Sequence, residues 1–207
     1  MKILVTGFDP FGNENINPAY EAVKALPDSI EETQIIKLQV PTIFEKAPKV
    51  LEAALLTYKP DAVICVGQAG GRADITIEKV AINLQEARIP DNEGKKPIDA
   101  KVKEDGDVAY FASLPIKAIV RRLQQEDIPA SISYTAGTYV CNALLYTLMY
   151  LIDKKKLNTI GGFVHVPYIP EQVVSKPSGT PSMSRGIIIE ALQLIIKTVA
   201  KNTDIQK

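Results

Sequence analysis

Short apolar runs alternate along the chain with longer segments in which apolar positions recur at helical spacing. The short runs predict strands at residues 2–6, 33–40, 61–67, 130–134 and 159–166. The longer segments predict helices at residues 17–26, 44–59, 113–127, 142–155 and 184–201. This alternation predicts an α/β fold in which residues 1–207 form one domain, a three-layer α/β/α sandwich with a largely parallel central sheet.

The sequence around Cys141 favours a reactive role for this thiol. It lies where the strand expected at residues 130–134 has turned through Gly137 into an apolar helix. The helix dipole and the free N–H groups of a helix start favour thiolate over thiol, so we expect a lowered thiol pKa here. The other cysteine, Cys65, lies inside an all-apolar strand and is interpreted as a small buried hydrophobe.

The chain contains a single histidine, so a Cys–His hydrolase built from this sequence must use His165 as its base. His165 ends an apolar run, and Pro167 cannot donate to a sheet ladder, so the strand stops near it. Cys141 and His165 therefore map to the same edge of the sheet, where open α/β folds place their sites. In such a pair the imidazole takes the thiol proton and the sulfur attacks a carbonyl group.

Glu78 is a candidate third member of this group. It lies in an alternating run at residues 75–83 which, if extended, carries Thr76, Glu78, Val80 and Ile82 on one face. A carboxylate between apolar neighbours is costly unless it has a partner. Two interpretations follow: a solvent-facing edge strand, or an acid that orients the imidazole in a Cys–His–Glu triad.

The composition limits the partners and the compartment. The 207 residues suffice for one sizeable core, and 24 basic residues balance 24 acidic ones. We therefore expect neither nucleic acid nor an anionic membrane as a partner. The apolar runs are too short for a membrane span or a signal peptide, and the two cysteines do not indicate a disulfide framework, so we expect a cytosolic protein. The sequence lacks the common zinc-binding motifs, so we expect no metal site.

The loop at residues 68–72 supports a different hypothesis. Its adjacent glycines, Gly70 and Gly71, let the backbone approach a ligand closely, although the loop matches neither common phosphate-binding motif. A phosphate- or nucleoside-binding α/β enzyme would use this loop for the anion, and Cys141 would then be structural. A third hypothesis is a non-catalytic binding protein that has kept the scaffold.

Six blocks of the sequence, in the same order, resemble those of the type I pyroglutamyl peptidases. The blocks are residues 5–11, 67–72, 80–83, 87–92, 136–142 and 163–170. The resemblance covers nearly the full length. It implies a cysteine peptidase that removes an N-terminal 5-oxoproline from peptides without a metal or cofactor. It also implies a single α/β/α domain that assembles as a homotetramer.

The resemblance assigns roles to individual residues. It implies Cys141 as the nucleophile that forms a thioacyl intermediate, His165 as the base and Glu78 as the orienting acid. Arg88 matches a family residue near the oxyanion site, beside the Cys141 backbone N–H. The substrate-binding residues that it implies are Phe8, Phe11, Gln68, Ile89, Tyr139 and Val140. Position 139 is commonly phenylalanine in the family, so the Tyr139 hydroxyl must find a partner or face water.

The expected substrate agrees with these residues. Pyroglutamate has no free α-amino group, and its neutral lactam offers one N–H and one C=O. Apolar walls plus the backbone of the Gln68 loop suit such a ring, and the sequence shows no acidic cluster near the site that would anchor an ammonium. The apolar segment at residues 166–174 is expected to be a surface loop, consistent with a subunit contact and equally with a cap on the core.

Overall fold

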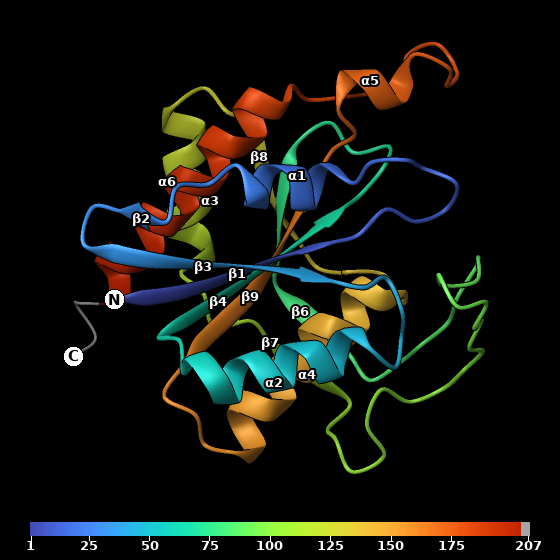
Figure 1. Ribbon diagram of the computed structural model, residues 1–207, viewed down its shortest axis with the longest axis vertical. Coiled ribbons are helices and arrows are strands. Elements are labelled where there is room, and N and C mark those ends of the chain that lie inside the picture. The colour runs from blue at the N-terminus through green and yellow to red at the C-terminus, as the bar shows by residue number, and fades with distance from the viewer. Residues whose placement is uncertain (204–207) are drawn as a thin grey trace.

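Residues 1–203, the part of the chain that the computed structural model describes, build a seven-stranded sheet between two layers of helices (Figure 1). In spatial order its strands are β2 (Ser29–Ile30), β3 (Thr33–Val40), β1 (Lys2–Phe8), β4 (Ala62–Gln68), β9 (Ile160–Val166), β5 (Ile75–Glu78) and β8 (Ala130–Ser133). A separate two-stranded sheet pairs β6 (Val80–Ile82) with β7 (Ala109–Phe111). Strands β3, β1, β4 and β9 are parallel, whereas β2 is antiparallel to β3 and β5 is antiparallel to β9. The main sheet is therefore largely parallel, as predicted.

Helices cover both faces of the main sheet (Figure 1). One face carries α1 (Pro18–Lys24), α3 (Ile116–Gln125) and α6 (Arg185–Thr203), and the other carries α2 (Ala47–Tyr58) and α4 (Val140–Lys154). Successive strand residues point to opposite faces, so Val164 packs in the first core layer and Phe163 in the second. The predicted three-layer sandwich is confirmed.

Local sequence signals explain where two of the helices begin. Asn17 caps α1, because its side-chain oxygen accepts a hydrogen bond from the Ala19 N–H at 3.1 Å, and Pro18 follows at the first helical position. Pro48 lies in the first turn of α2, where its missing N–H costs nothing. Helix α2 ends at Tyr58, and the C-cap residue Lys59 that follows has a left-handed backbone with φ 46°.

The alternating run at residues 75–83 does not form one strand. The Lys79 N–H donates to the Ser133 carbonyl of β8 at 2.7 Å, and the chain then leaves the main sheet to form β6. The expected shared face therefore ends at Glu78, and Val80 and Ile82 belong to the other sheet. Only the Glu78 side is relevant to the site.

The segment at residues 166–174 is mainly a cap on the core. Val166 and Ile169 are fully buried, and the short helix α5 (Pro170–Val173) follows them. Pro170 and Glu171 are exposed and Val174 is 87% exposed, so the expected surface position holds for part of the segment. The buried residues fit the alternative of a cap on the core.

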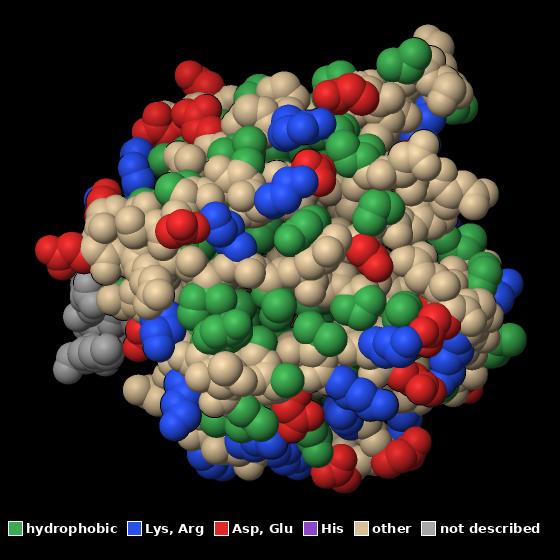
Figure 2. All heavy atoms as spheres, viewed as in Figure 1, with side chains coloured by type: hydrophobic (Ala, Val, Ile, Leu, Met, Phe, Trp, Pro, Cys, Tyr) green, Lys and Arg blue, Asp and Glu red, His purple; other side chains and the backbone are tan. Residues whose placement is uncertain are grey.

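Acidic and basic side chains are interspersed on the face of the molecule shown in Figure 2. This mixture agrees with the equal numbers of the two kinds in the sequence. None of the helices within residues 1–203 combines the length and the apolar character that crossing a membrane requires.

Candidate active site

Cys141 occupies the first turn of α4, as the sequence predicts. Tyr139 is the N-cap residue, with an extended backbone, and Gly137 supplies the left-handed turn before it with φ 75°. The first intrahelical hydrogen bond runs from the Ala143 N–H to the Tyr139 carbonyl at 3.2 Å. The N–H of Cys141 therefore has no partner inside the helix and lies next to its own thiol.

His165 and Glu78 meet across the β9–β5 pair. The register places Thr76 opposite His165 and Glu78 opposite Phe163, so all four side chains lie on the same face of the sheet. The His165 Nδ1 lies 2.7 Å from the Glu78 Oε1, and both side chains are buried. With Nδ1–H donating to the carboxylate, the other ring nitrogen, Nε2, is left free to accept a proton.

The absence of a side chain at Gly67 leaves room for the Cys141 thiol on the His165 side of the sheet. Gly67 is the register partner of His165 on the neighbouring parallel strand. A Cβ on Gly67 would lie 3.0 Å from the Cys141 Sγ and 2.7 Å from the Phe163 ring. The missing side chain thus leaves the space beside His165 that the sulfur occupies, and both residues line one cavity of about 700 Å³.

Burial sets the protonation states of Cys141 and His165. Loss of water around the sulfur raises the pKa of Cys141 to about 12, and the Glu78 charge adds to this effect. Burial also lowers the pKa of His165, although Glu78 opposes it. The expectation that the helix start favours a thiolate at rest is wrong, because burial outweighs the helix N-terminus. Both shifts favour a neutral thiol beside a neutral imidazole.

Glu78 is held as a carboxylate. Burial alone would raise its pKa, but the hydrogen bonds and charges of His165 and Arg72 outweigh burial and keep the pKa below its ordinary value. The Arg72 Nη1 donates to the same oxygen, Oε1, at 2.8 Å. Glu78 is therefore partnered inside the sheet and does not face solvent from an edge strand.

The cavity places four of the predicted substrate-binding residues together. Phe11, Ile89, Tyr139 and Gln68 all line it. The Tyr139 ring packs 5.2 Å from the Phe44 ring, between centroids. Its hydroxyl donates to the Pro90 carbonyl at 2.9 Å, so the hydroxyl that the sequence left unpartnered has found a partner.

The remaining predicted residues lie in different surroundings. Phe8 and Val140 are buried in the core layer behind the cavity and do not line it. Phe8 packs against the Phe163 ring at 6.3 Å, between centroids. Arg88 is exposed and lines the cavity with Cys141. Among residues 1–203, no ion pair or side-chain hydrogen bond engages Arg88, so its guanidinium is available to a ligand.

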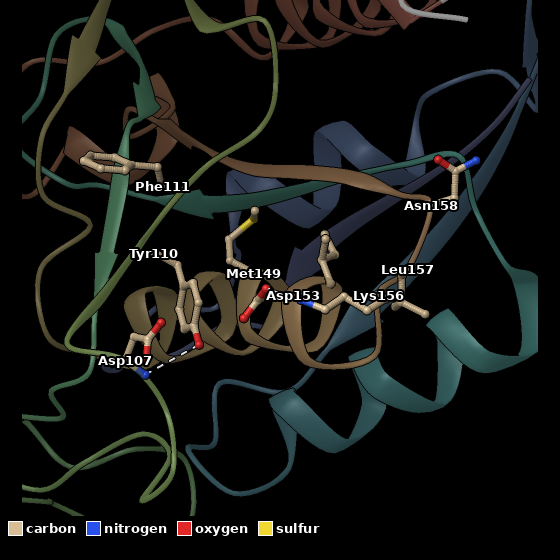
Figure 3. A pocket seen from close by; sticks show the side chains of 9 residues that line it. Asp107, Tyr110, Phe111, Met149, Asp153, Lys156, Leu157 and Asn158 are labelled. Carbon is tan, nitrogen blue, oxygen red and sulfur yellow. Dashed lines mark hydrogen bonds and ion pairs between the residues drawn. The ribbon is translucent and has the colours of Figure 1, made fainter.

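Another hollow lies between β7 and the C-terminal half of α4 (Figure 3). Its lining includes Tyr110, Phe111, Met149, Asp153 and Lys156, with no cysteine or histidine. Cys141 lies at the opposite end of the same helix. No group of metal-binding side chains occurs within the described residues. Of these two hollows, only the cavity at Cys141 is lined by a thiol and an imidazole.

The comparisons with known proteins agree with this geometry. The family model for pyroglutamyl peptidase matches residues 1–202. The pyrrolidone-carboxylate peptidase of Clostridium botulinum is 58% identical over 207 residues, which are 100% of this chain and 97% of that protein. The solved pyroglutamyl peptidase I of Bacillus amyloliquefaciens is 50% identical, with a TM-score of 0.93 over 96% of this chain and 94% of that chain. The solved pyrrolidone carboxyl peptidase of Thermococcus litoralis is 37% identical, with a TM-score of 0.96 over 100% and 96%.

The chain belongs to the pyroglutamyl peptidase family. It is accordingly a hydrolase, a cysteine peptidase of the omega-peptidase type.

This pyroglutamyl peptidase family member contains site residues that the sequence did not single out. The sequence indicates Arg72 only as part of an anion loop, but its guanidinium donates a hydrogen bond to Glu78. The buried Gln172 of α5 donates through Nε2 to the Gln68 side-chain oxygen at 2.8 Å. An arginine six residues before a predicted catalytic acid was the available signal for Arg72. A four-residue helix gave no comparable signal for Gln172.

The rim of the cavity carries charges of both signs. Glu14 and Glu86 line it together with Arg88 and Lys176. Glu14 is neutralised, because the Lys176 Nζ lies 2.6 Å from its Oε1. The exposed Glu86 accepts a hydrogen bond from the Asp99 N–H at 2.8 Å. Neither carboxylate is a bare anchor for a substrate ammonium.

Proposed function

We propose that this chain removes the N-terminal pyroglutamyl residue from peptides through a Cys141–His165–Glu78 triad. The observation that carries the proposal is the buried hydrogen bond between His165 and Glu78, next to a cavity that both His165 and the Cys141 thiol line. Membership of the pyroglutamyl peptidase family supports the substrate. A thiol nucleophile, a base and a group that orients the base, brought together at one site, are what acyl transfer through a thiol requires.

The reaction begins with a neutral pair. As the Cys141 sulfur attacks the pyroglutamyl carbonyl carbon, its proton moves to Nε2 of His165 and the carbonyl electron pair moves onto oxygen. The tetrahedral intermediate collapses, the C–N bond breaks, and His165 gives the proton to the departing amine. A thioester remains. Water then gives a proton to His165 as its oxygen attacks the thioester carbonyl. The C–S bond breaks, His165 returns the proton to the Cys141 sulfur, and pyroglutamic acid is released.

Glu78 supports both steps. Its carboxylate accepts the hydrogen bond from Nδ1, which fixes the tautomer with Nε2 as the acceptor. It also stabilises the imidazolium that forms when the thiol proton is transferred. A carboxylate held ionised by its neighbours His165 and Arg72 meets this requirement better than one that could take up a proton.

The oxyanion is stabilised by the Cys141 backbone N–H and by Arg88. The N–H lies in the first turn of α4, where the helix dipole favours negative charge. Arg88 lines the same cavity with a free guanidinium. Each such donor is worth roughly 3 kcal/mol in related acyl-transfer chemistry.

The lactam ring fits between the apolar walls of Phe11, Ile89 and Tyr139. Phe8 and Val140 back these walls from the core, and the backbone of the Gln68 loop binds the lactam. A glutamyl residue would bring an ammonium and a carboxylate into this slot, at a desolvation cost of several kcal/mol. A prolyl residue would bring a charged amine and lack the ring carbonyl. The pocket therefore selects pyroglutamyl peptides.

The phosphate-loop hypothesis is less well supported. The Arg72 guanidinium, which an anion loop would direct at its ligand, is directed at Glu78 instead. The non-catalytic hypothesis does not explain why the Glu78 carboxylate and His165 are buried together, because moving a charge out of water is costly. Neither alternative has an observation in its favour.

Residues 1–207 function as one pyroglutamyl peptidase domain in a cytosolic homotetramer. Both cysteines are free, and a reducing compartment keeps the nucleophile as a thiol. Exposed apolar side chains such as Val108 and Phe111 are available for contacts between subunits. Light scattering at micromolar concentration tests the assembly, and a monomeric mass would contradict it.

Release of a fluorophore from pyroglutamyl, glutamyl and prolyl amides tests the function. We expect hydrolysis of the pyroglutamyl amide in the presence of a thiol reductant. The other two amides should react at least ~10⁴-fold more slowly, because they leave buried lactam partners unpaired. Comparable kcat/KM values for the three amides would overturn the substrate assignment.

A further inference from the structure

We propose that Arg72 is a positioning residue, a fourth member of the catalytic group that fixes the Glu78 carboxylate for its hydrogen bond with His165. This inference rests on the proposed function, because it concerns the same triad. Arg72 does not contact the sulfur or the imidazole in this arrangement. It acts through Glu78.

The geometry centres on one oxygen atom. The Glu78 Oε1 lies 2.7 Å from His165 Nδ1 and 2.8 Å from Arg72 Nη1. A carboxylate on a strand can turn about its terminal bond, and a single imidazole would leave that turn open. The second donor removes this freedom, so Oε1 faces His165 before substrate arrives.

Arg72 is itself held in place. Its Nη1 also donates to the Thr76 hydroxyl, and its Nη2 donates to the Thr135 carbonyl at 3.4 Å. Its backbone N–H donates to the Ala69 carbonyl at 3.3 Å. Thr76 and Glu78 both lie on β5, and Thr76 is the register partner of His165, so the guanidinium lies along the strand that pairs with the histidine strand. Three separate anchors make it a fixed part of the site.

The side chain is placed for electrostatics as well as for geometry. Glu78 is fully buried, whereas the Arg72 side chain is 30% exposed and keeps part of its hydration. The titratable and charged groups that act on Cys141 are Glu78, Cys65 and Arg72. Those that act on His165 are Glu78 and Arg72. The Arg72 charge acts to lower the pKa values of both His165 and Cys141. Loss of that charge should therefore raise both pKa values.

Three substitutions separate a positioning role from a structural one. Arg72→Met removes the charge and the donors, Arg72→Gln keeps a donor without charge, and Arg72→Lys keeps the charge. Arg122→Met is the matched control, because it removes an arginine that pairs with Glu126 on the surface of α3. Each variant is measured for thermal unfolding, for kcat and KM on a pyroglutamyl amide, and for the pH dependence of Cys141 alkylation by iodoacetamide, read by peptide mass spectrometry.

We expect Arg72→Met to lower kcat by roughly 10- to 100-fold, as loss of a residue that holds a functional side chain in place typically does. KM should be nearly retained. The acid limbs of kcat/KM and of alkylation should move to higher pH. Arg72→Lys should return both limbs toward the wild-type position, and Arg122→Met should change neither.

The proposal is overturned if Arg72→Met folds and the acid limbs of kcat/KM and of alkylation do not move. It is also overturned if KM rises while kcat is unchanged, because that result indicates a substrate contact. If Arg72→Met does not fold, Arg72→Gln decides by the same criteria. If neither folds, the role is structural and the proposal fails. Alkylation needs no pyroglutamyl substrate, so it still decides the role of Arg72 if the wild type spares pyroglutamyl amides and the proposed function fails.

Discussion

Gly67 and Cys141 approach so closely that a single added methyl group would touch the sulfur: the ideal Cβ of Gly67 lies 3.0 Å from Sγ. The contact joins the C-terminal end of β4 to the first turn of α4, and His165 is next to Gly67 across the sheet. The Cys141 thiol has room on the His165 side of the sheet because one strand residue has no side chain. This relationship gives the first testable consequence.

Gly67→Ala should lower both activity and stability. Its Cβ would lie 2.7 Å from the Phe163 ring, and such overpacking typically costs about 1–3 kcal/mol. The displaced sulfur should lose its alignment with His165 and lower kcat. The matched control is Gly186→Ala in α6, where the nearest atom is 4.0 Å away. Thermal unfolding and kcat that match the wild type in Gly67→Ala would contradict this packing.

His165→Ala should be as damaging as Cys141→Ala, and the double variant should lose little more. Residues that act as one unit are strongly non-additive. Glu78→Gln should cost less than either, because the Cys141–His165 pair keeps some function without its orienter. The measurement is kcat/KM for all four proteins on a pyroglutamyl amide. Losses that multiply on combining the first two changes would show that they act independently.

The sequence predicted the positions of Cys141 and His165 because each lies at an ordinary structural signal. Gly137 before an apolar helix indicates the start of α4, and Pro167 after an apolar run indicates the end of β9. Each boundary is local, so a single sequence contains it. The alternation of strands and helices predicted the layers for the same reason.

Other features depend on contacts between distant segments. The break at Lys79 follows from pairing with Ser133 on β8, and nothing within residues 75–83 encodes it. The raised pKa of Cys141 follows from burial by the surrounding segments, which outweighs the local helix-start effect. The Arg72–Glu78 contact depends on how the loop after β4 folds back. Such features require the folded chain.

Activity should persist below pH 6.5, the ordinary pKa of histidine. His165 must be neutral to take the thiol proton, and burial lowers its pKa, so it stays neutral to a lower pH than a free histidine. Activity should fall only as the pH drops through that lowered pKa. In Glu78→Gln the limb should move further down, because Glu78 raises the pKa of His165. The measurement is the pH profile of kcat/KM, and an acid limb above pH 6.5 would contradict the assigned protonation states.

Tyr139→Phe should change kcat/KM by less than about tenfold, or under ~1.4 kcal/mol. The hydroxyl is occupied by the Pro90 carbonyl, and the net value of such a hydrogen bond is about 1 kcal/mol. The ring contacts with Phe11 and Phe44 do not need the hydroxyl. Selectivity for pyroglutamyl over glutamyl and prolyl amides should be retained. A loss of selectivity would mean that the hydroxyl binds the substrate.

The central claim is that the pyroglutamyl group is transferred to Cys141, and acid-quench mass spectrometry during turnover of an activated pyroglutamyl ester tests it most directly. The expected result is a mass increase of one pyroglutamyl group on the peptide that contains Cys141, seen in the wild type and in Cys65→Ala and absent from Cys141→Ala. An adduct on Cys65, or full hydrolysis by folded Cys141→Ala, would contradict the claim.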